Sequence, residues 1–147
     1  MNLKNYTSTV PVEKSITLIE KKLVSIGATH IAKIYEGEPR QLKGITFQIT
    51  INNIPRLFKL PSKAETVFTV MWSEIKKPHQ STRKNIEEQS LRTAWKLLSD
   101  WVDIQASMIL LEQAELAEVF LPYMYDGKTN QTLFEIIKKD NYKLLTQ

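Results

Sequence analysis

The fold is decided by one stretch of the chain, Gly44-Ile-Thr-Phe-Gln-Ile-Thr-Ile-Asn-Asn-Ile-Pro-Arg-Leu-Phe-Lys-Leu-Pro61. Apolar residues occupy every second position from 45 to 51, which is the pattern of a strand with one buried face. Asn52-Asn53 can adopt the positive φ angles of a tight hairpin turn, so residues 54–60 are expected to return as a second strand. Pro55 has no backbone donor, which favours an edge position for that returning strand.

The residues on the N-terminal side predict a further strand and a helix. Segment 30–35 is short and rich in branched and aromatic residues, and Gly37 to Pro39 read as the turn after it. Earlier, apolar residues recur at spacings of four, three, four and three from Val12 to Ile26, which is one face of an amphipathic helix. Gly27 is suited to end this helix in a left-handed conformation. We therefore expect a helix followed by three antiparallel strands in meander order.

Three helices are expected after the strands. Ser62-Lys-Ala-Glu65 has the form of a capping box and predicts a helix that ends near Lys76. A second helix is predicted from about Asn85, and no helix-breaking residue occurs before Phe120. Thr132-Leu-Phe-Glu135 is another capping box and predicts a terminal helix.

The predicted fold class is α+β. A small three-stranded antiparallel meander is packed with four helices, one of them long, in the order αβββααα, and residues 1–147 form a single domain. A helix of more than thirty residues that is apolar on more than one side favours a partner helix from another copy. We therefore also predict a homo-oligomer that assembles through the long helix.

Composition argues against most classes of enzyme. The 147 residues include no cysteine, two histidines and only four glycines, so a thiolate metal site, a cysteine nucleophile and a glycine-rich phosphate loop are excluded. No G-x-S-x-G motif is present. We predict a protein that is not an enzyme, with no cofactor and no metal. The less favoured alternative is a metal-dependent hydrolase that uses closely spaced carboxylates on the long helix, namely Asp100 and Asp103 or Glu112, Glu115 and Glu118.

Charge is unevenly distributed along the chain. Residues 1–84 carry 14 Lys and Arg against six Asp and Glu, a net charge of +8, whereas residues 85–147 carry six against ten, a net charge of −4. Such asymmetry is typical of a half that binds polyanions, or of two surfaces that attract in an oligomer. The N-terminus has no signal-peptide pattern and the longest apolar run is Met108 to Leu111, which predicts a cytoplasmic protein without a membrane span.

Three basic groups are candidates for binding phosphate. Arg56 and Lys59 share the returning strand, and Arg92 and Lys96 lie one helical turn apart beside Trp95. A cation and an indole together can clamp a base and its phosphate, although core packing is the more favoured role for Trp95. A secondary basic loop precedes the long helix and contains Lys76, Lys77, Arg83 and Lys84.

Several strings occur in an order that resembles a family of small uncharacterised proteins encoded by tailed bacteriophages and prophages. They are Thr7-Ser-Thr-Val-Pro-Val-Glu13, Gly27-Ala28, Gly44-Ile-Thr-Phe47, Phe58-Lys-Leu-Pro61, Ala94-Trp-Lys96, Asp100-Trp101, Gln105 and Phe120-Leu-Pro-Tyr-Met124. The similar proteins usually carry arginine where this chain has Lys59 and Lys96, so the charge is kept and the planar fork is lost. The resemblance implies a protein that acts in the cytoplasm of a bacterial host.

Charge and context together predict a phage-encoded, non-enzymatic binding protein. Its ligand is expected to bear phosphate, either a nucleic acid or a signalling nucleotide, and its role to lie in phage DNA metabolism or counter-defence. The alternative is a protein–protein interaction module that inhibits a host defence enzyme. Nothing in the sequence identifies the ligand or the host protein.

Overall fold

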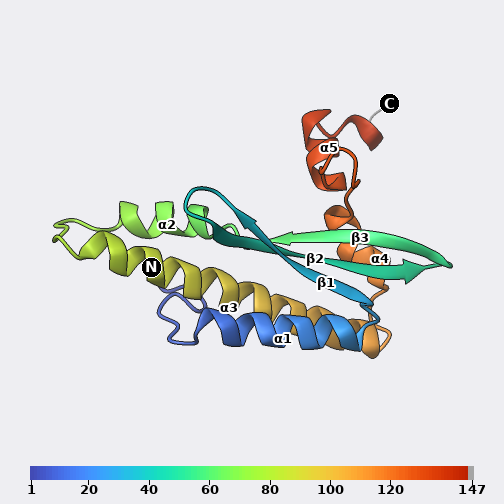
Figure 1. Ribbon diagram of the computed structural model, residues 1–147, viewed down its shortest axis with the longest axis horizontal. Coiled ribbons are helices and arrows are strands. Elements are labelled where there is room, and N and C mark those ends of the chain that lie inside the picture. The colour runs from blue at the N-terminus through green and yellow to red at the C-terminus, as the bar shows by residue number, and fades with distance from the viewer. Residues whose placement is uncertain (146–147) are drawn as a thin grey trace. The chain divides into compact units, whose positions relative to one another are not determined.

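The computed structural model of the protein describes residues 1–145 and has an α+β architecture (Figure 1). Its elements follow the predicted order, a helix, three strands and then helices, and their bounds are α1 Val12–Ser25, β1 His30–Glu36, β2 Gln41–Ile51, β3 Ile54–Pro61, α2 Ala64–Ser73, α3 Thr82–Leu110, α4 Leu116–Phe120 and α5 Leu133–Lys139. Two short 3₁₀ turns, η1 (Leu121–Tyr123) and η2 (Lys143–Leu145), complete the described chain. The predicted fold class is confirmed, with five α-helices among these residues rather than four.

The chain divides into two compact units. The first consists of residues 1–22 and 62–104, and the second begins with residues 23–61 and resumes at Gln105. The first unit holds most of α1, all of α2 and most of α3, whereas the second holds the sheet, α4 and α5. The single-domain organisation predicted from the sequence stays a prediction.

Helix packing forms the core of the first unit. α1 lies beside α3 (Figure 1), and the Lys22 amine forms an ion pair with the Asp103 carboxylate at 3.2 Å. The buried apolar residues include Ile16 and Ile19 of α1 and Ala94, Trp95 and Val102 of α3, and the side chains of Ile19 and Trp95 are completely inaccessible. Burial of about 150–250 Å² of an aromatic side chain such as Trp95 is a large part of what holds small helical units together.

A three-stranded antiparallel sheet in the order β1-β2-β3 forms the centre of the second unit. Its apolar face pairs Ile45 with Leu60 and Phe47 with Phe58 across β2 and β3. Phe47 and Phe58 stack with ring centroids 5.1 Å apart, and the Phe120 ring of α4 meets both rings nearly edge-on, at 5.4 and 6.2 Å. Such offset and edge-to-face contacts stabilise a core beyond the area they bury.

The predicted turns next to the sheet are confirmed. Asn52 and Asn53 both have positive φ angles, 51° and 66°, and form the two-residue loop between β2 and β3. Gly27 has a φ of +111°, and the Gly27 and Ala28 amides donate to the carbonyls of Val24 and Leu23. This pair of hydrogen bonds is a Schellman motif, which ends α1 as the sequence indicated.

The capping box predicted at Ser62 is wrong. α2 begins at Ala64, and its N-cap residue is Lys63, which adopts a left-handed conformation with a φ of 53°. The Ser62 hydroxyl is buried without a hydrogen-bond partner among the described residues. Because Ser62 lies one residue before the N-cap, its hydroxyl does not reach the amides of the first turn. The capping box at Thr132 is confirmed, since the Glu135 amide donates to the Thr132 Oγ1 at 3.2 Å.

The long helix is shorter than the sequence indicated. α3 spans 29 residues from Thr82 and ends at Leu110, before Phe120. Glu112 adopts a left-handed conformation with a φ of 62°, and the Gln113 amide donates to the Met108 carbonyl at 2.8 Å. A glutamate therefore occupies the position where a helix ending of this kind usually has glycine. For this reason the end of α3 could not be predicted from the sequence.

Candidate functional site

The predicted ligand-binding residues fall in both units. Arg92, Trp95 and Lys96 belong to α3 in the first unit, and Arg56 and Lys59 belong to β3 in the second. Trp95 is completely buried, so its ring is not available to stack on a base. This burial excludes the clamp that the sequence suggested for Trp95 and leaves core packing as its role.

Arg92 belongs to a polar face of α3 that holds the N-terminal segment. The Arg92 Nε donates to the Ser8 carbonyl at 3.3 Å, and one terminal nitrogen donates to the Gln89 Oε1 at 2.7 Å. The Gln89 amide in turn donates to the carbonyls of Tyr6 and Ser8. An arginine used in this way orders a backbone segment, so its guanidinium is not free for a ligand.

Lys96 is also engaged, because its amine donates to the Asp100 carboxylate. Asp100 accepts a second hydrogen bond from the Asn5 amide at 2.8 Å and lies 3.6 Å from the Lys4 amine. Burial raises the pKa of Asp100, but the hydrogen bonds from Lys96 and Asn5 and the two lysine charges outweigh this effect. The pKa of Asp100 therefore lies below its ordinary value of 3.8.

Replacing Asp100 with asparagine is expected to lower the free energy of unfolding by about 1 kcal/mol at neutral pH. Because folding lowers the pKa of Asp100, its ionised form stabilises the protein above about pH 4, and this contribution is lost as the pH falls through the lower folded-state value. Denaturant titrations at about pH 7 and pH 3 should therefore show the difference shrinking in acid. Asp103→Asn is the matched control. It removes the Lys22–Asp103 ion pair, whose side chains are more exposed, and should lower the free energy of unfolding by less.

Of the predicted secondary basic loop, only Lys76 and Lys77 lie between α2 and α3, because Arg83 and Lys84 belong to the first turn of α3. The Arg83 guanidinium stands over the rings of Phe68 and Trp72, at 5.1 and 5.6 Å from their centroids, and pairs with Glu87 at 3.2 Å. Lys76, Lys77 and Lys84 are exposed, and no hydrogen bond or ion pair involves them within residues 1–145. These three unpaired lysines, two on the exposed loop and one on the first turn of α3, are suited to contact a phosphate backbone, but they form no enclosed site.

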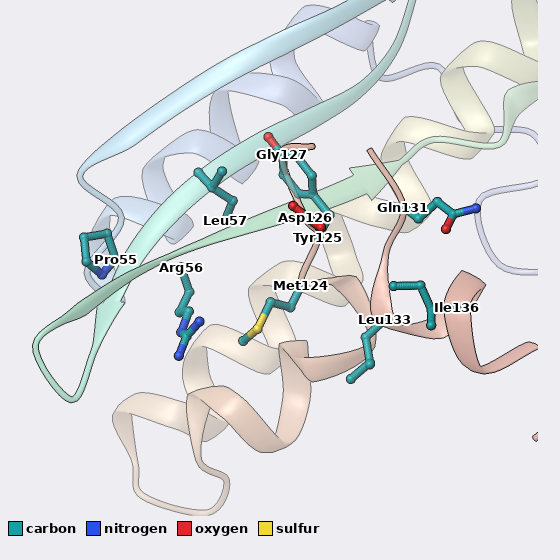
Figure 2. Close-up of a pocket in the computed structure, with 10 residues that line it drawn as sticks. All are labelled: Pro55, Arg56, Leu57, Met124, Tyr125, Asp126, Gly127, Gln131, Leu133 and Ile136. Atoms are coloured by element: carbon teal, nitrogen blue, oxygen red, sulfur yellow. The ribbon is translucent and has the colours of Figure 1, made fainter. Parts of the chain in front are cut away.

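A pocket of about 380 Å³ lies at the outer edge of β3 in the second unit (Figure 2). The segment that follows η1 pairs with this edge: Met124 bridges Phe58, and the Tyr125 amide donates to the Leu57 carbonyl at 2.9 Å. The other walls of the pocket come from the loop that follows Tyr125 and from α5. The full lining is Pro55, Arg56, Leu57, Met124, Tyr125, Asp126, Gly127, Gln131, Leu133 and Ile136.

Arg56 is the cation of this pocket. It pairs across the sheet with Ile49, which is only 4% exposed, so the arginine follows Leu60 and Phe58 on the apolar face and precedes Ile54, which pairs with Ile51. Its side chain projects to the same side of β3 as Met124 and Leu133 (Figure 2). The residue is exposed, and its guanidinium forms no hydrogen bond or ion pair with any residue that the structure describes.

Lys59 has a different role from Arg56. Its amine donates to the Asn130 Oδ1 at 3.0 Å and to the Asn130 carbonyl at 3.2 Å, and it lies 5.5 Å from the centroid of the Tyr125 ring. Lys59 therefore fixes the loop that closes one side of the pocket. Of the four cations predicted as the main binding group, only Arg56 is unpaired among residues 1–145.

The two sets of carboxylates considered for a hydrolase have different surroundings. Asp100 and Asp103 pair with lysines, as described above. Glu112, Glu115 and Glu118 line an open hollow at the start of α4. Among the described residues, no group of three or more histidine, aspartate or glutamate side chains is arranged to hold a metal ion.

None of the helices between Met1 and Leu145 is both long and apolar enough to cross a membrane.

Comparison with known proteins adds no assignment. No protein-family model matches the chain, and neither the curated proteins nor the solved structures contain a match. The class that fold and pocket define is therefore an α+β protein with a small open pocket at a sheet edge. The resemblance to phage proteins stays a prediction.

Proposed function

We propose that the protein binds a small phosphate-bearing ligand, of which a nucleotide is the favoured class, without catalysing a reaction. The observation that carries this proposal is that Arg56 has an exposed and unpaired guanidinium on an otherwise apolar sheet face. A guanidinium presents a planar fork of donors that matches the geometry of phosphate oxygens. An arginine placed opposite a buried isoleucine, with no carboxylate paired to it within residues 1–145, is suited to receive an anion from outside the chain.

The remaining walls suit the organic part of such a ligand. Met124 and Leu133 line the same pocket as Arg56 (Figure 2), and a thioether adapts its shape to a flat ring. Gln131 and Asp126 supply amide and carboxylate groups for polar edges. A volume of about 380 Å³ lies within the ordinary range of small-molecule sites, about 300–1,000 Å³. If the resemblance to phage proteins holds, the ligand would be a nucleotide of the bacterial host.

The test is isothermal titration calorimetry with ribonucleoside monophosphates, triphosphates and cyclic nucleotides, and with inorganic phosphate. Arg56→Ala is expected to weaken binding about 10- to 100-fold, because a hydrogen-bonded charge contact contributes about 1.5–3 kcal/mol. Arg40→Ala, an exposed arginine whose own hydrogen bond is to the Tyr35 carbonyl, is the matched control and should leave affinity unchanged. Equal affinity of Arg56→Ala and the unchanged protein would overturn the proposal.

A second experiment distinguishes a nucleotide ligand from a nucleic acid. The probe is a fluorescent single-stranded oligonucleotide titrated at several salt concentrations. A polynucleotide bound by the basic loop would show a steep loss of affinity with salt and would be weakened by replacing Lys76, Lys77 and Lys84 with glutamine. That outcome, together with no effect of Arg56→Ala, would move the phosphate site to the first unit and refute the assignment to the pocket.

A further inference from the structure

A second cavity lies between α1 and α3 in the first unit, and Lys96 is the one predicted binding residue in its lining. It is an open groove of about 560 Å³. Val10 and Leu18 supply apolar surface, and the stems of the lysines that line it add to that surface. The groove is therefore large enough for a small organic molecule, and its walls favour one with an apolar body.

The rim of the groove is positively charged. Lys14 and Lys21 are seven residues apart on α1, so they lie on the same side of the helix two turns from each other. Neither amine takes part in an ion pair within the part of the chain that the structure describes. Lys96 reaches the groove from α3 with its amine held by Asp100, and Glu13 is the acidic residue of the lining.

Two buried hydroxyl groups in the same lining lack partners. Ser15 of α1 and Ser99 of α3 are only 2% and 1% exposed, and neither Oγ has a hydrogen-bond partner among the described residues. An unsatisfied buried hydroxyl is costly and calls for an explanation. Both serines line the groove, so an oxygen of a ligand bound there is a suitable acceptor for these hydroxyls.

From these observations we propose that the groove between α1 and α3 binds an anionic amphiphile, a carboxylate or phosphate monoester joined to an apolar chain. The Lys14 and Lys21 amines face the anionic group, Val10 and Leu18 contact the chain, and the Ser15 and Ser99 hydroxyls donate to the ligand oxygens. This site is independent of the Arg56 pocket, because no residue lines both.

The experiment uses decanoate, below the concentration at which it aggregates, as the probe and decanol as the neutral probe of equal length. Binding is followed by calorimetry and by ¹H–¹⁵N NMR of the labelled full-length protein. Decanoate is expected to bind about tenfold more tightly than decanol, with shifts concentrated in the amides of residues 14–21 and 95–99. Equal affinity for the two probes, or shifts elsewhere in the chain, would overturn the proposal.

Variants locate the contacts. Lys21→Gln removes an exposed amine and is expected to weaken decanoate about two- to fivefold while decanol binding stays the same. Lys139→Gln makes the same charge change on α5 and should have no effect. Ser99→Ala removes the hydroxyl without adding an atom to this buried position, and should weaken decanoate binding while the protein remains folded by circular dichroism. A loss that appears equally in Lys139→Gln would refute the site.

The decanoate test of the groove and the nucleotide test of the Arg56 pocket can fail independently. Arg56→Ala should leave decanoate binding unchanged, and Lys21→Gln should leave nucleotide binding unchanged. If decanoate fails to bind while nucleotides bind through Arg56, only the groove assignment falls. If Arg56→Ala abolishes binding of both probes, the groove is not the decanoate site.

Discussion

Replacing Phe58 with alanine is expected to lower the free energy of unfolding by about 4 kcal/mol, because large-to-small changes of buried aromatic residues cost about 3–5 kcal/mol. Phe58 is completely buried and stacks on Phe47 at 5.1 Å. It also meets the Phe120 ring at 6.2 Å, so its loss opens a cavity between the sheet and α4. Neighbouring rings fill such a cavity only in part, and the lost contacts are not replaced.

The measurement is denaturant unfolding followed by circular dichroism. Phe134→Ala is the matched control, since Phe134 is 43% exposed on α5 and its replacement should cost less than about 1 kcal/mol. If the two compact units unfold in separate transitions, only the transition of the second unit should move. A similar loss of stability in both variants would contradict the central role given to the ring cluster.

The sequence predicted the sheet well because its signals are local. Alternation from 45 to 51 sets the buried face, and Asn52 and Asn53 determine the turn, so the register between β2 and β3 follows from adjacent residues. Pro55 on an edge strand follows from its missing donor. Each of these features depends on residues that are close in the chain.

The helix boundaries predicted from the sequence were wrong where a helix begins or ends at a residue type that is rare at helix ends. Lys63 and Glu112 both adopt left-handed conformations at helix ends, where glycine or asparagine is the usual choice. Ser62-Lys-Ala-Glu65 consequently looked like a capping box, and the chain from Asn85 to Phe120 looked like one helix. Surrounding structure overrides a local preference at both positions, and a single sequence gives no sign of it.

The candidate site was predicted only in part. Arg56 was named from its charge, but its partners Met124 and Leu133 were not, because they reach the edge of β3 from more than sixty residues further along the chain. The Phe120-Leu-Pro-Tyr-Met124 string carried the only signal for this wall, through the resemblance to phage proteins. Arg92 and Lys96 were indistinguishable from Arg56 by charge, and their partners Ser8 and Asp100 became evident only in the folded chain.

Replacing Gly44 with alanine is expected to lower the free energy of unfolding by about 2–3 kcal/mol, a cost typical of inserting atoms into a packed interior. A Cβ atom on Gly44 would lie 2.6 Å from the Leu60 carbonyl oxygen and 3.2 Å from the Pro61 Cα. Both obstacles belong to the backbone of β3, so no side-chain rotation relieves them. The strands would have to separate where Gly44 pairs with Pro61, which weakens the ladder next to the Phe47–Phe58 pair.

Gly127→Ala separates this steric effect from the general effect of losing a glycine. The nearest atom to a Cβ on Gly127 is the Leu57 Cδ1 at 4.0 Å, an ordinary contact, and the residue does not have a positive φ. Alanine there should leave stability unchanged or raise it by about 0.5 kcal/mol, because it restricts the unfolded chain. Denaturant unfolding of both variants measures the difference. Equal effects of the two variants would mean that β2 and β3 tolerate a side chain at Gly44. The close approach of these strands would then contribute nothing to the stability of the sheet that carries Arg56.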